Sequence, residues 1–96
     1  MPRVSLSQIE YFVAVAEEGS VSRAARRLHL SQPPLSRRLH ELEDELGAPL
    51  FRRTSRGVSL LPTGEAFLVH ARAVLASVAR AREAVLDVQL PSRTSR

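Results

Sequence analysis

Cysteine and lysine are absent from the 96 residues, and only four residues, three Phe and one Tyr, are aromatic. The absence of cysteine excludes a disulfide framework, a cysteine-based zinc site and a cysteine nucleophile. No segment resembles a signal peptide, and no apolar run approaches the roughly 18 residues of a membrane span. We therefore expect one small soluble domain of the cytoplasm, with or without an extension, whose core is mostly Leu, Val and Ala.

The three histidines do not form a metal site or a catalytic arrangement. His29, His40 and His70 lack the spacing of metal ligands and have no clustered carboxylate partners. A glycine-rich phosphate loop and a nucleophile elbow are also missing. We expect no catalytic residue, no cofactor and no small-molecule ligand in this chain, and we interpret His29 as a structural turn residue.

Charge is distributed unevenly along the chain. The formal net charge is +4, and every basic residue is Arg. Residues 20–40 contain five arginines and residues 50–60 contain three, with no acid in either segment, whereas acids gather in residues 41–45. Two concentrated basic segments favour a phosphate backbone as partner, the alternative being an ordinary solvated surface.

Residues 31–46 have the pattern of a helix with one apolar face. Ser31 suits the N-cap because its hydroxyl can accept from backbone N–H groups, and prolines are tolerated in a first turn. Gly47 is a C-terminal stop. The inward face consists of Leu35, Leu39, Leu42 and Leu46, and the leading end offers Gln32, Pro33, Pro34, Ser36, Arg37 and Arg38. Such a helix suits a DNA major groove.

Two shorter helices are predicted before it. Ser5 and Gln8 form a capping box that opens a helix ending at Gly19. Ser20 caps a second helix over residues 21–28, which a brief connection joins to the third. Two short helices joined in this way predict a helix-turn-helix at about residues 21–40.

Residues 50–60 predict a two-stranded wing. Two short apolar runs bracket the basic segment Arg52–Arg56, and Gly57 can supply the positive φ that a tight turn needs. An arginine at the tip of such a hairpin can enter a minor groove. A plain surface loop is the alternative. Residues 4–61 thus make a winged helix-turn-helix domain in a mainly α fold.

Residues 62–90 predict one long helix that links or dimerises chains. A second apolar line, which includes Leu68 and Leu75, gives this helix two faces to bury. One face can pack on its own domain and the other on a second chain, although a helix that only covers its own domain is the alternative. Pro91 ends the helix, and residues 91–96 are expected to be a disordered tail. The heptad seam predicted for dimerisation is Phe67, Ala71, Val74, Val78, Ala81, Val85 and Val88.

The order of elements and the local motifs together resemble the N-terminal DNA-binding domain of the LysR-type transcriptional regulators. The resemblance covers about residues 4–90, and the motifs are very specific as a set. Its residues are Tyr11–Ser20, Ala24-Ala25, Leu28-His29, Ser31–Arg37, Leu42-Glu43, Glu45–Gly47, Pro49–Arg53 and Gly64-Glu65.

This resemblance implies dimeric, sequence-specific binding to partly palindromic promoter DNA. Major-groove reading is implied for Gln32, Pro33, Pro34, Ser36 and Arg37, and a minor-groove contact for Arg56. Backbone phosphate contacts are implied for Ser22, Arg23 and Ser31.

The sequence also departs from the family pattern. Arg38 stands where Gln is frequent, which offers an extra phosphate or base contact. Leu61 replaces a usual capping Thr or Ser and Thr63 a usual Ala, so the linker helix is expected to fray at its start or to use another partner. The family continues into an effector-binding domain that the residues after Leu90 cannot build. The alternative function is therefore a dimerisation module that antagonises a full-length regulator by forming mixed dimers.

Overall fold

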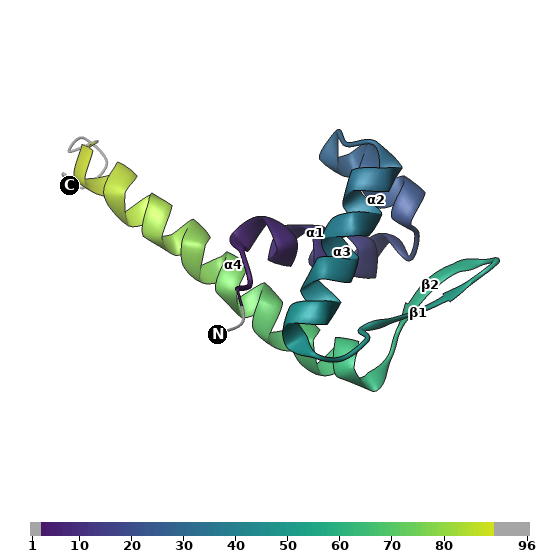
Figure 1. Cartoon of the computed structure of the whole chain (residues 1–96). Coiled ribbons are helices and arrows are strands. Elements are labelled where there is room, and N and C mark those ends of the chain that lie inside the picture. Colours follow the sequence, from purple (N-terminus) through teal and green to yellow (C-terminus); the bar gives the residue numbers. More distant parts are fainter. Residues whose placement is uncertain (1–2, 90–96) are drawn as a thin grey trace.

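Three short helices form a cluster from which a hairpin and a long helix project in different directions (Figure 1). The computed structural model describes residues 3–89, so the predicted tail at 91–96 and the helix end at Leu90 lie outside the described residues. The elements are α1 (Leu6–Glu18), α2 (Val21–Leu28), α3 (Gln32–Leu46), β1 (Phe51–Thr54), β2 (Gly57–Leu60) and α4 (Pro62–Gln89). The predicted winged helix-turn-helix with a long C-terminal helix is confirmed.

Capping fixes the ends of α1 and α2 as the sequence predicted. The Gln8 backbone N–H donates to Ser5 Oγ at 3.2 Å, and the Ser5 N–H donates to Gln8 Oε1 at 2.9 Å, which completes the capping box. Gly19 ends α1 in the left-handed region with φ 66°. His29 ends α2 in the same region with φ 59°, which confirms it as a turn residue.

The start of α3 corrects one expectation. Ser31 occupies the N-cap, but its side chain makes no capping hydrogen bond. A capping hydroxyl accepts from the second or third helical N–H, and here those positions are Pro33 and Pro34, which have none. The Ser31 hydroxyl is therefore left without the role that the sequence suggested.

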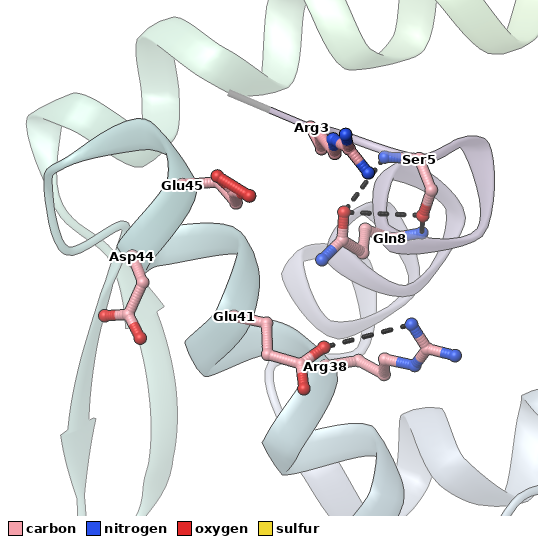
Figure 2. Close-up of a pocket in the computed structure, with 7 residues that line it drawn as sticks. All are labelled: Arg3, Ser5, Gln8, Arg38, Glu41, Asp44 and Glu45. Carbon is pink, nitrogen blue, oxygen red and sulfur yellow. Dashed lines mark hydrogen bonds and ion pairs between the residues drawn. The ribbon is translucent and has the colours of Figure 1, made fainter. Parts of the chain in front are cut away.

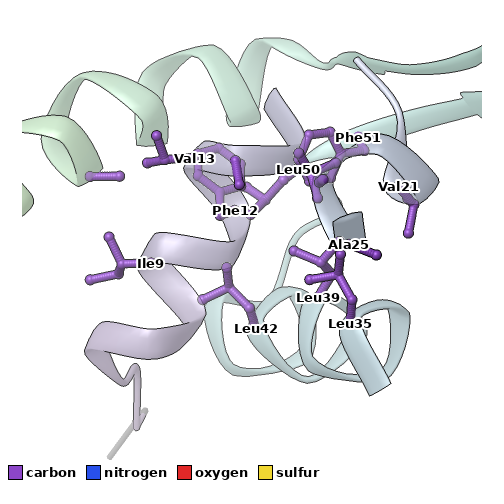
Figure 3. Packing of buried hydrophobic residues seen from close by; sticks show 14 residues of the cluster. Ile9, Phe12, Val13, Val21, Ala25, Leu35, Leu39, Leu42, Leu50 and Phe51 are labelled. Carbon is purple, nitrogen blue, oxygen red and sulfur yellow. The ribbon is translucent and has the colours of Figure 1, made fainter. Parts of the chain in front are cut away.

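The core lies where α1, α2, α3, the wing and the start of α4 meet. The Phe12 ring is fully buried, with ring centroids 5.2 Å from Phe51 and 4.9 Å from Phe67. Leu35, Leu39 and Leu42 extend the core beneath α3 (Figure 3). Leu46 was expected to be the fourth buried leucine, but it is 37% exposed because α3 ends there, beyond the helices it packs on.

The wing is docked on the helices by a backbone contact. In the antiparallel hairpin Arg53 pairs with Val58 and Thr54 with Gly57. The Val58 N–H donates to the Gly19 carbonyl at 3.1 Å. Gly57 has φ 133°, and a Cβ there would lie 2.5 Å from the Gly19 oxygen. Glycine is thus required at this position by both conformation and space.

The first half of α4 packs on its own domain, which covers part of the predicted seam. Ala71 is buried in the core and Phe67 packs on Phe12, so Ala71 has no surface left for a second chain. Val74, the next position of the predicted seam, is 38% exposed. The helix has 28 residues, a length of about 42 Å at 1.5 Å per residue, and its second half extends past the helical cluster (Figure 1).

The start of α4 is tethered to the segment that follows α3. The Thr63 hydroxyl donates to the Pro49 carbonyl, and the Glu65 N–H donates to the Leu61 carbonyl at 2.9 Å.

Within residues 3–89, every helix is too short or too polar to cross a membrane.

Candidate nucleic-acid interface

The leading end of α3 presents the side chains predicted to read bases. Gln32, Pro33 and Arg37 are exposed, and Pro34 and Ser36 are partly exposed. They are held in place because Leu35 and Leu39, which alternate with them, are buried at 0% and 1% exposure. The two prolines also remove backbone donors that would otherwise need partners at the helix start.

A hollow of about 400 Å³ separates this end of α3 from the wing. The starts of α2 and α3 form one wall and the hairpin forms the other. Among the predicted residues it brings together Ser22, Gln32 and Arg56. No Asp or Glu lines it, so the basic side chains are not neutralised locally. Because a DNA strand carries regularly spaced phosphates, a hollow of this kind between a helix end and a wing suits a duplex backbone.

The arginines fall into two groups. One group has no acidic partner within the described residues. It consists of Arg26, Arg37, Arg52, Arg53 and Arg56. Arg23, in contrast, lies 3.8 Å from the Glu18 carboxylate, and its guanidinium donates to the Glu18 carbonyl at 2.7 Å.

Arg38 is also set apart from the predicted reading positions. Its guanidinium lies 3.8 Å from the Glu41 carboxylate, in a hollow that faces the start of α1 (Figure 2). It thus lies on the opposite flank of α3 from Gln32, which lines the hollow beside the wing.

A cluster of charges joins α1, α2 and α4 behind the candidate interface. The Arg27 guanidinium, 2.9 Å from Glu17, holds the pKa of that carboxyl below its ordinary value, with a smaller effect of Arg72 at 3.2 Å. The same contact raises the pKa of Arg27. Glu17 and Glu18 lie at the C-terminal end of α1, where the helix dipole disfavours negative charge. Their pairing with arginines offsets this unfavourable interaction. The Arg27 side chain is therefore engaged in ion pairs within the fold.

Of the two arginines that line the hollow, sequence reasoning named Arg56 as a DNA contact and gave Arg53 no individual role. The signal was present in the alternation of strand side chains, because Arg53 shares a face with buried Phe51 and so faces the helices. Glu43 was also missed as a structural group: its carboxylate accepts the N–H groups of Leu50 at 2.8 Å and Phe51 at 3.3 Å. Across residues 3–89, no three potential ligands gather into a metal site.

These elements define a winged helix-turn-helix domain with a basic face. Residues 6–65 match the family described as "Bacterial regulatory helix-turn-helix protein, lysR family". The chain belongs to this family of DNA-binding transcription regulators.

Curated relatives extend well beyond the length of this chain. Over 81 residues it is 57% identical to the HTH-type transcriptional regulator TfdS of Cupriavidus pinatubonensis, and the aligned region covers 80% of this chain and 28% of TfdS. It is 42% identical over 93 residues to AlsR of Bacillus subtilis, covering 97% of this chain and 29% of AlsR. The chain therefore spans less than a third of the length of these relatives.

Solved structures match the fold over nearly the whole chain. A crystal structure of a CbnR DNA-binding domain in complex with DNA aligns with a TM-score of 0.84 at 41% identity, covering 90% of this chain and 99% of that one. The BenM DNA-binding domain in complex with benA site 1 DNA aligns with a TM-score of 0.85 at 40% identity, covering 90% and 97%.

Proposed function

We propose that this chain binds double-stranded DNA as a dimer at partly palindromic promoter sites and thereby regulates transcription in the cytoplasm. The observation that carries the proposal is the leading end of α3 with the wing beside it, where Gln32, Arg37 and Arg56 are exposed and neither arginine is paired with an acid. The DNA in the complexes of CbnR and BenM supports it. The proposal requires no catalysis, cofactor, small molecule or membrane.

In this proposal α3 lies in the major groove and reads bases. Gln32 pairs with adenine and Arg37 with guanine, each contributing roughly 1–3 kcal/mol of discrimination. Ser36 offers a further hydrogen bond, and Pro33 and Pro34 contact thymine methyl groups. Arg56 at the wing tip enters the minor groove.

Phosphate contacts provide most of the affinity in the same proposal. Ser22 and the Ser31 hydroxyl, which makes no capping bond, are suited to this role. Arg23 and Arg38 contribute by exchanging a carboxylate partner for a phosphate.

The dimer is supported by apolar surface on α4. Val85 is 59% exposed and Val88 is 82% exposed, at positions that continue the heptad spacing from Val74 through Val78 and Ala81. At the other end of the helix an apolar hollow of about 340 Å³ lies between Leu46 and Phe67. Exposed apolar stripes of this kind are buried by association.

The base-reading role is tested by titrating the chain against two duplexes at two salt concentrations. One duplex is selected from a randomised pool by the unmodified chain, and the other has random sequence. We expect Arg37→Ala to weaken binding to the selected duplex about 5- to 150-fold, the range that 1–3 kcal/mol corresponds to, and binding to random DNA much less. Arg80→Ala, an exposed change on α4, is the matched control. Equal losses on both duplexes would refute the reading role of Arg37.

Stoichiometry separates the proposal from the mixed-dimer alternative. Two chains for each selected duplex, with affinity well above random DNA, support the dimeric reader. A dimer in solution without useful DNA affinity would favour the antagonist instead. Val85→Glu is expected to abolish the dimer while leaving the helix-turn-helix folded, because Val85 makes no contact with the core of its own domain.

A further inference from the structure

We infer that the hollow between the start of α1 and the second half of α3 binds a free amino acid with a cationic side chain, such as arginine. The hollow has a volume of about 520 Å³, which is within the range of small-molecule sites (Figure 2). It lies on the opposite flank of α3 from the hollow beside the wing, so a molecule bound here leaves the face proposed to meet DNA uncovered. The sequence pattern indicated no small-molecule ligand, because the two walls come from separate helices and only their packing forms the hollow.

The wall formed by α3 is negatively charged. Glu41, Asp44 and Glu45 share this side of the helix because they lie one turn apart. Asp44 and Glu45 have no ion-pair partner within residues 3–89, and Glu41 has only Arg38, at 3.8 Å. The Glu45 carboxylate points across the hollow toward α1 (Figure 2). Such a wall accepts hydrogen bonds from an ammonium or guanidinium group.

The opposite wall donates hydrogen bonds. The Gln8 side chain is only 5% exposed, and its Oε1 accepts from the Ser5 N–H at 2.9 Å and from the Ser5 hydroxyl at 3.3 Å. These bonds leave the amide nitrogen on the side of α3, where it has no hydrogen-bond partner among the described residues (Figure 2). The Arg3 guanidinium, also without an ion pair there, lines the same wall. Because a buried amide donor is costly to leave unpaired, this wall favours a ligand with an acceptor oxygen.

Two walls of opposite polarity select a molecule that carries both charges. A carboxylate suits Gln8 Nε2 and Arg3, and a cation suits the acids of α3. The hollow is lined by three carboxylates and two guanidinium groups, which leaves a single net negative charge. A basic amino acid has a single net positive charge and is complementary, whereas a neutral or acidic amino acid is not. An internal residue of a polypeptide lacks the carboxylate that suits Arg3, which favours the free amino acid.

The test follows the backbone amide chemical shifts of the full chain by NMR while L-arginine is added at constant ionic strength. We expect saturable shifts in the millimolar range, confined to the start of α1 and the second half of α3. Agmatine lacks the carboxylate, and L-citrulline lacks the charge of the side chain. Each is expected to bind at least about fivefold more weakly than L-arginine, a factor set by the loss of one exposed ion pair.

Two variants test the two walls separately. Gln8→Glu replaces the donor by an acceptor and retains the capping box, because a glutamate oxygen can still accept from the Ser5 N–H. It is expected to weaken L-arginine binding about tenfold or more. Glu45→Gln is expected to weaken binding about fivefold. Glu83→Gln removes an exposed acid on α4 and is the matched control, with unchanged binding expected. Circular dichroism establishes that each variant keeps its helices.

The titration contains no DNA, so its failure would leave the proposed function untouched. Shifts spread over the whole surface of the chain would overturn the inference, and so would equal affinities for L-arginine and agmatine. Equal affinities of Glu45→Gln and Glu83→Gln for L-arginine would also overturn it, and this comparison does not depend on whether Gln8→Glu folds.

Discussion

Replacing Gly57 by Ala tests whether the wing is held by a close backbone approach. The new Cβ would lie 2.5 Å from the Gly19 carbonyl oxygen, and φ is 133°, a conformation that side chains other than glycine rarely adopt. The backbone strain costs about 1–3 kcal/mol. The wing must also move away from Gly19, which breaks the hydrogen bond from Val58 and costs about 0.5–1.5 kcal/mol more. We therefore expect the free energy of unfolding to fall by about 1.5–4.5 kcal/mol.

Gly47 provides the matched control for this substitution. It also has a positive φ, of 74°, but a Cβ there would meet nothing within 4 Å. Gly47→Ala therefore carries backbone strain of about 1–2 kcal/mol without a clash. Chemical denaturation at one fixed protein concentration measures both variants, since the stability of a dimer depends on concentration.

DNA binding adds a second readout to the same pair. Because Gly57 positions Arg53 and Arg56, Gly57→Ala is expected to lose wing-dependent affinity even where the helices remain folded. Gly47 lies at the far end of α3, so its variant is expected to retain that affinity. If Gly57→Ala costs no more stability than Gly47→Ala, the clash is not what holds the wing, and the reasoning is refuted.

Three further predictions concern the core, the loop after α3 and the charge cluster. Phe12→Ala is expected to cost about 3–5 kcal/mol in denaturation, because the ring is fully buried between two others; a loss below 1 kcal/mol would contradict this. Glu43→Ala is expected to cost about 1–3 kcal/mol, because two partly buried N–H groups lose their acceptor, and amide exchange at Leu50 should accelerate. Acid titration of stability tests Glu17. The pKa of its carboxyl is lower in the folded protein than the unfolded value of 4.5, so its ion pairs add stability above pH 4.5. This added stability is lost as the pH falls through the lower, folded pKa. Because the side chain is about one-third exposed, Glu17→Gln should remove at most about 1 kcal/mol of this acid dependence, and identical pH profiles would refute the contribution.

Local chemistry made most of the element boundaries predictable. Ser5, Gly19 and Ser20 act within one turn of their own positions, so their effect does not depend on the remainder of the chain. The positions of Leu35 and Leu39 likewise determine which side of α3 faces outward, and hence the exposure of Arg37. The outward-facing positions of α3 were for this reason predictable from the sequence.

Contacts between elements were not predictable in the same way. Arg23 lies beside Glu18 because of the angle between α1 and α2, which the pattern along either helix does not specify. The position of Arg53 in the hollow depends on how the wing folds back toward α2. On α4 the heptad spacing marked an apolar face, but it did not reveal how much of that face its own domain covers.

The sequence by itself determined the helices, the hairpin and the separation of basic from acidic surface, because capping, turn chemistry and apolar periodicity act over a few residues. Tertiary structure alone decided which side chains have partners or are buried within the fold. Packing on α1 buries Ala71, and the approach of Gly57 to Gly19 creates the hollow that Arg53 lines. These contacts depend on how whole elements meet, which the pattern along any one of them does not specify.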